Sequence, residues 1–182
     1  MTNRKLDGKK ILMVIARKDF RDEEYFIPKK IFEDNGAEVK TASSKIGAIL
    51  GFLGGETEAD MTIKNSKAED FDAVVFVGGN GAQEYFEDEE AHRVIRDFYG
   101  AGKTIGAICI APVILAKTSI LKDKKATVWQ SPTDKTGPRI LEQAGCSVST
   151  SSIEKSDNII TANGREASEE FANEIVGELA KK

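Results

Sequence analysis

Short apolar runs alternate with longer amphipathic stretches along this 182-residue chain, and this rhythm constrains the fold more than any other feature. The first run, Lys10-Ile-Leu-Met-Val-Ile-Ala16, is almost continuously apolar, as expected of a strand covered on both faces. Alternating strands and helices predict a mostly parallel sheet between helical layers, an α/β fold in one domain over 1–182. The predicted strands are 10–16, 37–43, 72–77, 103–108 and 158–162, and the predicted helices are 23–35, 88–100, 110–117, 136–144 and 164–181.

The stretch Ile46-Gly-Ala-Ile-Leu-Gly-Phe-Leu-Gly-Gly55 breaks this rhythm. Four glycines among apolar residues predict a hairpin or other excursion from the sheet, because glycine disfavours a helix. An exposed apolar segment of this kind is expensive to leave in water. We therefore expect residues 46–55 to form a contact between copies of the chain.

Composition excludes several classes of protein. The 26 basic and 30 acidic residues are interleaved and give a net charge of −4, which argues against a nucleic-acid partner. No run approaches the roughly 18 apolar residues of a membrane span, and the N-terminus lacks the apolar core of a signal peptide. With only two cysteines, a disulfide scaffold is not expected, and the chain is predicted to be cytoplasmic. The single histidine, His92, is predicted to be a solvated helix residue, so no metal site is expected.

In an open α/β sheet, ligands bind beyond the carboxyl ends of the strands, and Cys109 follows one such end. The run Gly106-Ala-Ile-Cys-Ile-Ala-Pro112 places the cysteine between small residues, the pattern of a nucleophile elbow. A cysteine beside a helix start gains thiolate character from the helix dipole and the free N–H groups. The alternative is a buried, inert cysteine. The other cysteine, Cys146, is predicted to pack as a small apolar residue.

Two further strand ends carry polar or flexible residues. Val77-Gly-Gly-Asn-Gly-Ala82 could point its N–H groups at a bound oxygen, although Gly-Gly after a strand also forms ordinary turns. Glu24 precedes Pro28, which is typical of a helix's first turn, so Glu24 is predicted at or just before the helix start. The carboxylate could accept a hydrogen bond from a thiol at a neighbouring strand end, or simply cap the helix.

The order Glu24-x-x-Ile-Pro28, Val77-Gly-Gly-Asn80 and Ala107-Ile-Cys-Ile-Ala-Pro112 resembles the ThiJ/PfpI superfamily of class I glutamine amidotransferase-like proteins. The resemblance covers nearly the whole chain. It implies a flavodoxin-like three-layer α/β/α sandwich and a homodimer or hexamer. It also implies that Cys109 is the reactive cysteine and that Glu24 hydrogen-bonds it. The backbone N–H groups of Gly78, Gly79 and Ile110 would stabilise an oxyanion.

The chain departs from this family at the histidine. PfpI-like proteases carry histidine directly after the cysteine, where this chain has Ile110. Other branches draw it from the segment after the next strand, which here reads Val128-Trp-Gln-Ser-Pro132. Neither Gln130 nor Ser131 can act as a general base near neutral pH. The resemblance places Asn80, Trp129 and Gln130 at the pocket, whereas Trp129 could equally fill the core.

Two classes of function remain open from the sequence. In the first, Cys109 and Glu24 act on a small carbonyl or amide compound, as a glyoxalase, deglycase or amidase would, without efficient peptide cleavage. In the second, the chain is a redox-responsive or chaperone-like stress protein whose Cys109 is oxidised without turnover. No cofactor motif is present, so no cofactor is expected.

Overall fold

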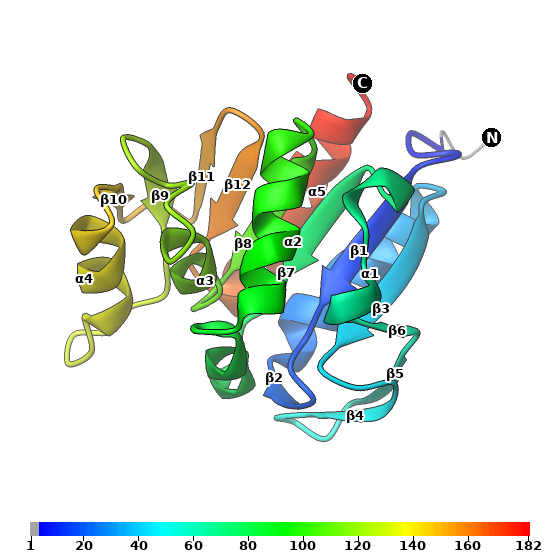
Figure 1. The fold of residues 1–182 in the computed structure, drawn as a ribbon, viewed down its shortest axis with the longest axis horizontal. Helices are drawn as coiled ribbons and strands as arrows, with labels where there is room; N and C mark the ends of the chain where they lie inside the picture. Colours follow the sequence, from blue (N-terminus) through cyan, green and yellow to red (C-terminus); the bar gives the residue numbers. More distant parts are fainter. Residues whose placement is uncertain (1–3) are drawn as a thin grey trace.

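A mostly parallel sheet forms the centre of the computed structural model, which describes residues 4–182 (Figure 1). Its strand order is β11-β12-β8-β7-β1-β3-β6, and only the β11–β12 pair is antiparallel among these described strands. The apolar runs supply the buried central strands, and the edges are formed by less buried strands. The strands are β1 (Lys10–Val14), β3 (Glu38–Ser43), β6 (Met61–Thr62), β7 (Ala73–Phe76), β8 (Thr104–Ile108), β11 (Ile153–Ser156) and β12 (Ile159–Ala162).

Helices cover both faces of this sheet. The helices α1 and α5 pack against each other on one face, and α2 lies on the other face beside α3 (Figure 1). A small parallel pair, β9 with β10, extends the molecule next to β11, and α4 packs on β10. These layers confirm the predicted flavodoxin-like α/β/α sandwich. The elements are α1 (Asp22–Asp34), α2 (Glu89–Gly100), α3 (Pro112–Ala116), α4 (Thr136–Gln143), α5 (Ser168–Leu179), β9 (Lys125–Thr127) and β10 (Ser147–Ser149).

Each predicted helix is present, but the position of Pro28 within the first and the start of the last differ from expectation. Pro28 was expected in the first turn of its helix, and this prediction is wrong: α1 begins at Asp22 and Pro28 lies buried inside it. The last helix starts at Ser168, after a 3₁₀ turn over Arg165–Ala167 that brings a basic side chain to the carboxyl end of β12. No helix within residues 4–182 is long and apolar enough to cross a bilayer.

The glycine-rich excursion is a hairpin, as predicted. Its strands β4 (Gly47–Gly51) and β5 (Glu56–Ala59) are antiparallel, and β4 pairs with β2 (Lys18–Phe20). The buried Asp22 carboxylate accepts hydrogen bonds of 2.7 Å from the N–H groups of Leu53 and Gly55. A Cβ atom at Gly51 or Gly55 would collide with this carboxylate. The hairpin tip is therefore fixed to the start of α1 by one acidic side chain.

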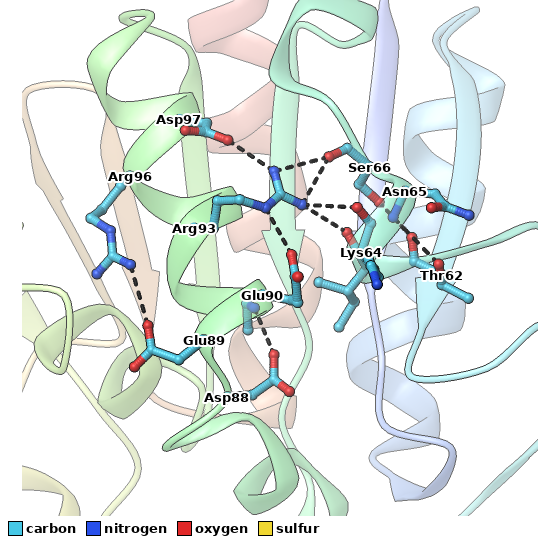
Figure 2. A network of polar contacts seen from close by, with 12 residues as sticks. Thr62, Lys64, Asn65, Ser66, Asp88, Glu89, Glu90, Arg93, Arg96 and Asp97 are labelled. Atoms are coloured by element: carbon cyan, nitrogen blue, oxygen red, sulfur yellow. Dashed lines mark hydrogen bonds and ion pairs between the residues drawn. The ribbon is translucent and has the colours of Figure 1, made fainter.

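Arg93 on α2 ties the loop after β6 to the helical layer (Figure 2). Its guanidinium donates to the carbonyl oxygens of Ile63, Lys64 and Ser66, and it also pairs with Glu90 and Asp97 on its own helix. These contacts satisfy loop carbonyls that no strand partner reaches.

His92, the neighbour of Arg93 in α2, is not the solvated residue expected from the sequence. Its side chain is 5% exposed, and Nε2 lies 2.9 Å from the carbonyl oxygen of Phe86. The acidic run before it suggested a fully exposed helix face. Instead the ring contacts the carbonyl of Phe86, the residue that follows the 3₁₀ turn Asn80–Tyr85.

An apolar surface remains open on the hairpin. Ile46, Leu50, Phe52 and Leu53 are 62%, 48%, 54% and 60% exposed, and Phe26 of α1 lies against the hairpin tip. Because such a surface is costly in water, we expect a homodimer or larger homo-oligomer that buries part of it.

Light scattering at micromolar concentration tests this expectation. The chain should give a multiple of the monomer mass, and Leu53→Glu should lower that mass by placing a charge in the contact. Tyr99→Glu, which changes an exposed aromatic residue of α2, should leave the mass as it is. A monomer mass for the unmodified chain would contradict the expectation.

Candidate active site

Cys109 occupies a sharp turn between β8 and α3. Its backbone has φ 64°, a left-handed conformation that costs a residue with a Cβ roughly 1–3 kcal/mol. Two neighbouring segments hold this conformation. The Cys109 N–H donates to Ala162 O at 2.9 Å, and the Trp129 N–H donates to Cys109 O at 2.8 Å. The turn has the form of the elbow expected from the sequence, and it raises the thiol above the strand end.

The glycine loop after β7 allows three backbone segments to meet beside this thiol. A Cβ at Gly78 would lie 2.5 Å from Cys109 Cβ and 2.6 Å from Glu24 Oε2. At Gly79, where φ is 96°, it would lie 2.5 Å from the backbone of Asp19 and Arg21. These glycines are thus required by close approach on both sides, which an ordinary turn would not need.

The N–H groups of the site divide between the two functional side chains. Those of Gly79 and Ile110 face the Cys109 sulfur, and that of Gly78 faces the Glu24 carboxyl. The sequence placed all three at one oxyanion. Gly79 and Ile110 remain candidates for that role, whereas Gly78 serves the carboxyl, because its residue lies between Glu24 and the cysteine.

The Glu24 carboxyl is buried, and few groups around it stabilise its negative charge. Its residue is 1% exposed, and Oε2 has no hydrogen-bond partner within residues 4–182. Burial raises the pKa of this carboxyl to about 7. The nearby Cys109 thiol, Arg21 and the Gly78 N–H lower that pKa only in part. The thiol therefore lies close to the carboxyl, but no well-formed hydrogen bond reaches Oε2.

The environment of the Cys109 thiol raises its pKa as well. Burial first, and then the negative charge of Glu24, raise its pKa to about 12. The N–H groups of Gly79 and Ile110 favour the thiolate but are outweighed. The sequence showed the groups that favour the thiolate, but not the burial that outweighs them. Because each charge disfavours the other, the two groups titrate as a unit.

A pocket of about 580 Å³ opens above this pair. Its polar lining mixes both signs of charge with two amides, and its apolar lining is mainly aromatic. The lining residues are Arg21, Glu24, Phe52, Gly79, Asn80, Gln83, Phe86, Cys109, Ile110, Trp129, Asp134, Thr136, Arg165 and Glu166. No group of three or more His, Cys, Asp or Glu side chains in the described chain is placed to hold a metal ion.

Most of the predicted site residues meet here. Asn80 and Trp129 line the pocket beside the cysteine, and Trp129 is 37% exposed, so it does not fill the core. Gln130 lies outside the lining, because its Oε1 atom accepts a hydrogen bond from Lys135 Nζ at 2.6 Å. The other cysteine, Cys146, is buried away from the pocket.

Several lining residues were not predicted. Arg165 and Glu166 follow the carboxyl end of β12. Because ligands bind beyond such strand ends, the sequence around 158–162 does carry a signal for them. Arg21 precedes α1 and was not singled out in the sequence. Phe52 reaches the pocket from the hairpin, and no local signal marks it.

The flavodoxin-like sandwich is the fold that the resemblance in the sequence implied. The chain belongs to the DJ-1/PfpI family, whose model matches residues 9–178.

Its relatives agree with this assignment. The chain is 38% identical over 173 residues to a protein of Methanocaldococcus jannaschii, covering 94% of this chain and 83% of that one. It is 32% identical over 120 residues to a deglycase of Pyrococcus horikoshii, covering 66% and 72%. The crystal structure of a ThiJ/PfpI domain protein from Brachyspira murdochii has a TM-score of 0.90 and 35% identity, covering 95% and 97%.

The raised pKa of Glu24 has a consequence for stability. In the unfolded chain the carboxyl ionises near pH 4.5, but in the folded protein it does so only near 7. The folded state therefore binds the extra proton between these values, and Glu24 costs stability as the pH rises through that window. The free energy of unfolding of Glu24→Gln, relative to that of the unmodified chain, should therefore rise by about 2–3 kcal/mol when the pH is raised from 4.5 to 8.5.

Urea unfolding at these two pH values measures the gain. Glu23→Gln is the matched control, because Glu23 is adjacent in the same helix but partly exposed and paired with Arg21. It should show no such gain. An equal effect of Glu24→Gln at both pH values would mean that the carboxyl ionises normally in the folded protein.

Proposed function

We propose that the chain is a cysteine-dependent enzyme of the deglycase or glyoxalase type, which acts on small carbonyl compounds or their adducts. The observation that carries the proposal is the pairing of Cys109 with a carboxyl whose pKa of about 7 suits proton transfer near neutral pH. The deglycase of Pyrococcus horikoshii among the relatives supports it.

The first chemical step follows from the geometry. The Cys109 sulfur adds to the carbonyl carbon, so a C–S bond forms and the C=O π electrons move to the oxygen. The thiol proton passes to the Glu24 carboxylate, and the negative charge develops on the substrate oxygen. The N–H groups of Gly79 and Ile110, which face the sulfur, would donate to that oxygen. Glu24 then holds the proton needed by the alkoxide or the departing carrier.

Peptide cleavage fits this site less well. An amide nitrogen must be protonated to leave, and proteases supply that proton from a histidine beside the nucleophile. The only histidine of the chain, His92, lies behind the pocket wall with its ring against the Phe86 carbonyl. Addition to an aldehyde or ketone expels no amine, so it needs no acid to protonate a leaving nitrogen.

The redox-sensing alternative also receives less support. Sensor cysteines are accessible and have a low pKa, because peroxide reacts with the thiolate. Burial and the Glu24 charge hold the pKa of Cys109 at about 12, which favours a thiol that is deprotonated only as it reacts.

Turnover of methylglyoxal by the purified chain tests the proposal. We expect its steady-state loss to need Cys109, so that Cys109→Ala lowers kcat/KM at least about 100-fold. In the unmodified chain kcat/KM should rise with pH through about 7, because the carboxylate form of Glu24 accepts the proton.

Cys146→Ala is the matched control and should keep full activity. Hydrolysis of fluorogenic peptides should be negligible for the same preparations. Absence of turnover, or turnover that survives Cys109→Ala, would contradict the proposal.

A further inference from the structure

Two arginines at the pocket rim have no part in the chemistry proposed above. Arg21 comes from the loop before α1, and Arg165 from the 3₁₀ turn after β12. Both line the same pocket as Cys109. Each has an acidic partner, Glu23 for Arg21 and Glu166 for Arg165.

The two guanidinium groups differ in how many of their nitrogens are already bound to a glutamate. Arg21 donates through Nε and Nη2 to the two carboxylate oxygens of Glu23, at 2.8 Å and 3.1 Å, and its guanidinium lies 5.5 Å from the ring centre of Phe52. Arg165 donates only through Nε, to Glu166 Oε1 at 2.8 Å. Within residues 4–182 no acceptor bonds its two terminal nitrogens. A planar pair of parallel N–H donors is the geometry that a carboxylate accepts.

The size of the pocket points in the same direction. Free methylglyoxal has only about five non-hydrogen atoms, whereas pockets of several hundred Å³ hold far larger ligands. The volume of about 580 Å³ therefore leaves most of the space for whatever carries the carbonyl group. The aromatic side chains of Phe52, Phe86 and Trp129 would cover the apolar part of that carrier.

We infer that the preferred substrate is a carbonyl adduct on a carboxylate-bearing carrier, whose carboxylate binds the terminal nitrogens of Arg165 while its carbonyl lies at Cys109. The inference rests on the proposed function and specifies its substrate class. Glu166 and Glu23 balance the charge of the two arginines and hold them in place. Selectivity therefore comes from the shape of the planar donor pair of Arg165, and Arg21, bound through two nitrogens to Glu23, forms part of the pocket wall.

A pair of hemithioacetals separates this inference from the proposed function. Methylglyoxal is combined with N-acetylcysteine, which bears a carboxylate, or with N-acetylcysteine amide, which does not. The concentrations of hemithioacetal and of free methylglyoxal are matched between the two. The readout is the ratio of kcat/KM for the acid to that for the amide.

In the unmodified chain this ratio should be at least about fivefold, as expected for a charge-assisted contact at a partly exposed site. Arg165→Gln should bring the ratio close to one. Arg96→Gln is the matched control, because Arg96 also pairs with a glutamate, Glu89, on the surface of α2 away from the pocket. It should keep the ratio of the unmodified chain.

The outcomes distinguish the two claims. Equal turnover of both hemithioacetals, or a preference that survives Arg165→Gln, would overturn the inference and leave the enzymatic activity standing. Turnover of neither would contradict the proposed function. In that case the inference is tested by measuring how tightly the Cys109→Ser chain binds N-acetylcysteine and its amide. Tighter binding of the acid would support the inference, and equal binding would overturn it.

Discussion

Gly78 lies between the Cys109 side chain and the Glu24 carboxyl, where even one additional carbon atom would collide with both. This contact joins the loop after β7, the turn after β8 and the first turn of α1. Because the segments approach so closely, the carboxyl is buried, and Oε2 finds no hydrogen-bond partner in the part of the chain that the structure describes. The raised pKa of Glu24 and that of Cys109 both follow from this packing.

The start of α1 serves several parts of the molecule at once. Arg21 faces the pocket, Asp22 fixes the hairpin tip and Glu24 faces the thiol. The hairpin in turn supplies Phe52 to the pocket wall. The shape of the pocket is therefore linked through Asp22 to the exposed apolar surface where we expect a second copy of the chain to bind.

A buried acid with a raised pKa and a left-handed cysteine both reduce stability, and the surrounding fold compensates for them. The central strands β1, β7 and β8 are buried from end to end apart from Lys10, and their side chains form one continuous core with the helices. Such a core tolerates a few unfavourable groups where function requires them. The site is thus held in place by elements that do not take part in its chemistry.

The sequence predicted the layers of the fold because buried parallel strands leave long apolar runs, as in residues 10–16. It also predicted the cysteine turn, since small residues flank Cys109. It did not predict the burial of His92, which depends on how a 3₁₀ turn packs on α2. The net direction of the Cys109 pKa could not be predicted, because local N–H groups are visible in a sequence, whereas burial and the distance to Glu24 are tertiary properties. Phe52 reaches the pocket for the same tertiary reason, whereas Arg165 follows a strand end, a local signal that the sequence does carry.

The ionisation of Glu24 tests the account most directly. The carboxyl carbon can be followed by ¹³C NMR as the pH is changed, in the chain labelled at glutamate and assigned by comparison with Glu24→Gln. The account predicts a midpoint for Glu24 at about pH 7. A midpoint near the ordinary glutamate value of about 4.5 would contradict it, because the carboxyl would then be solvated or already stabilised and could not take up the thiol proton as described.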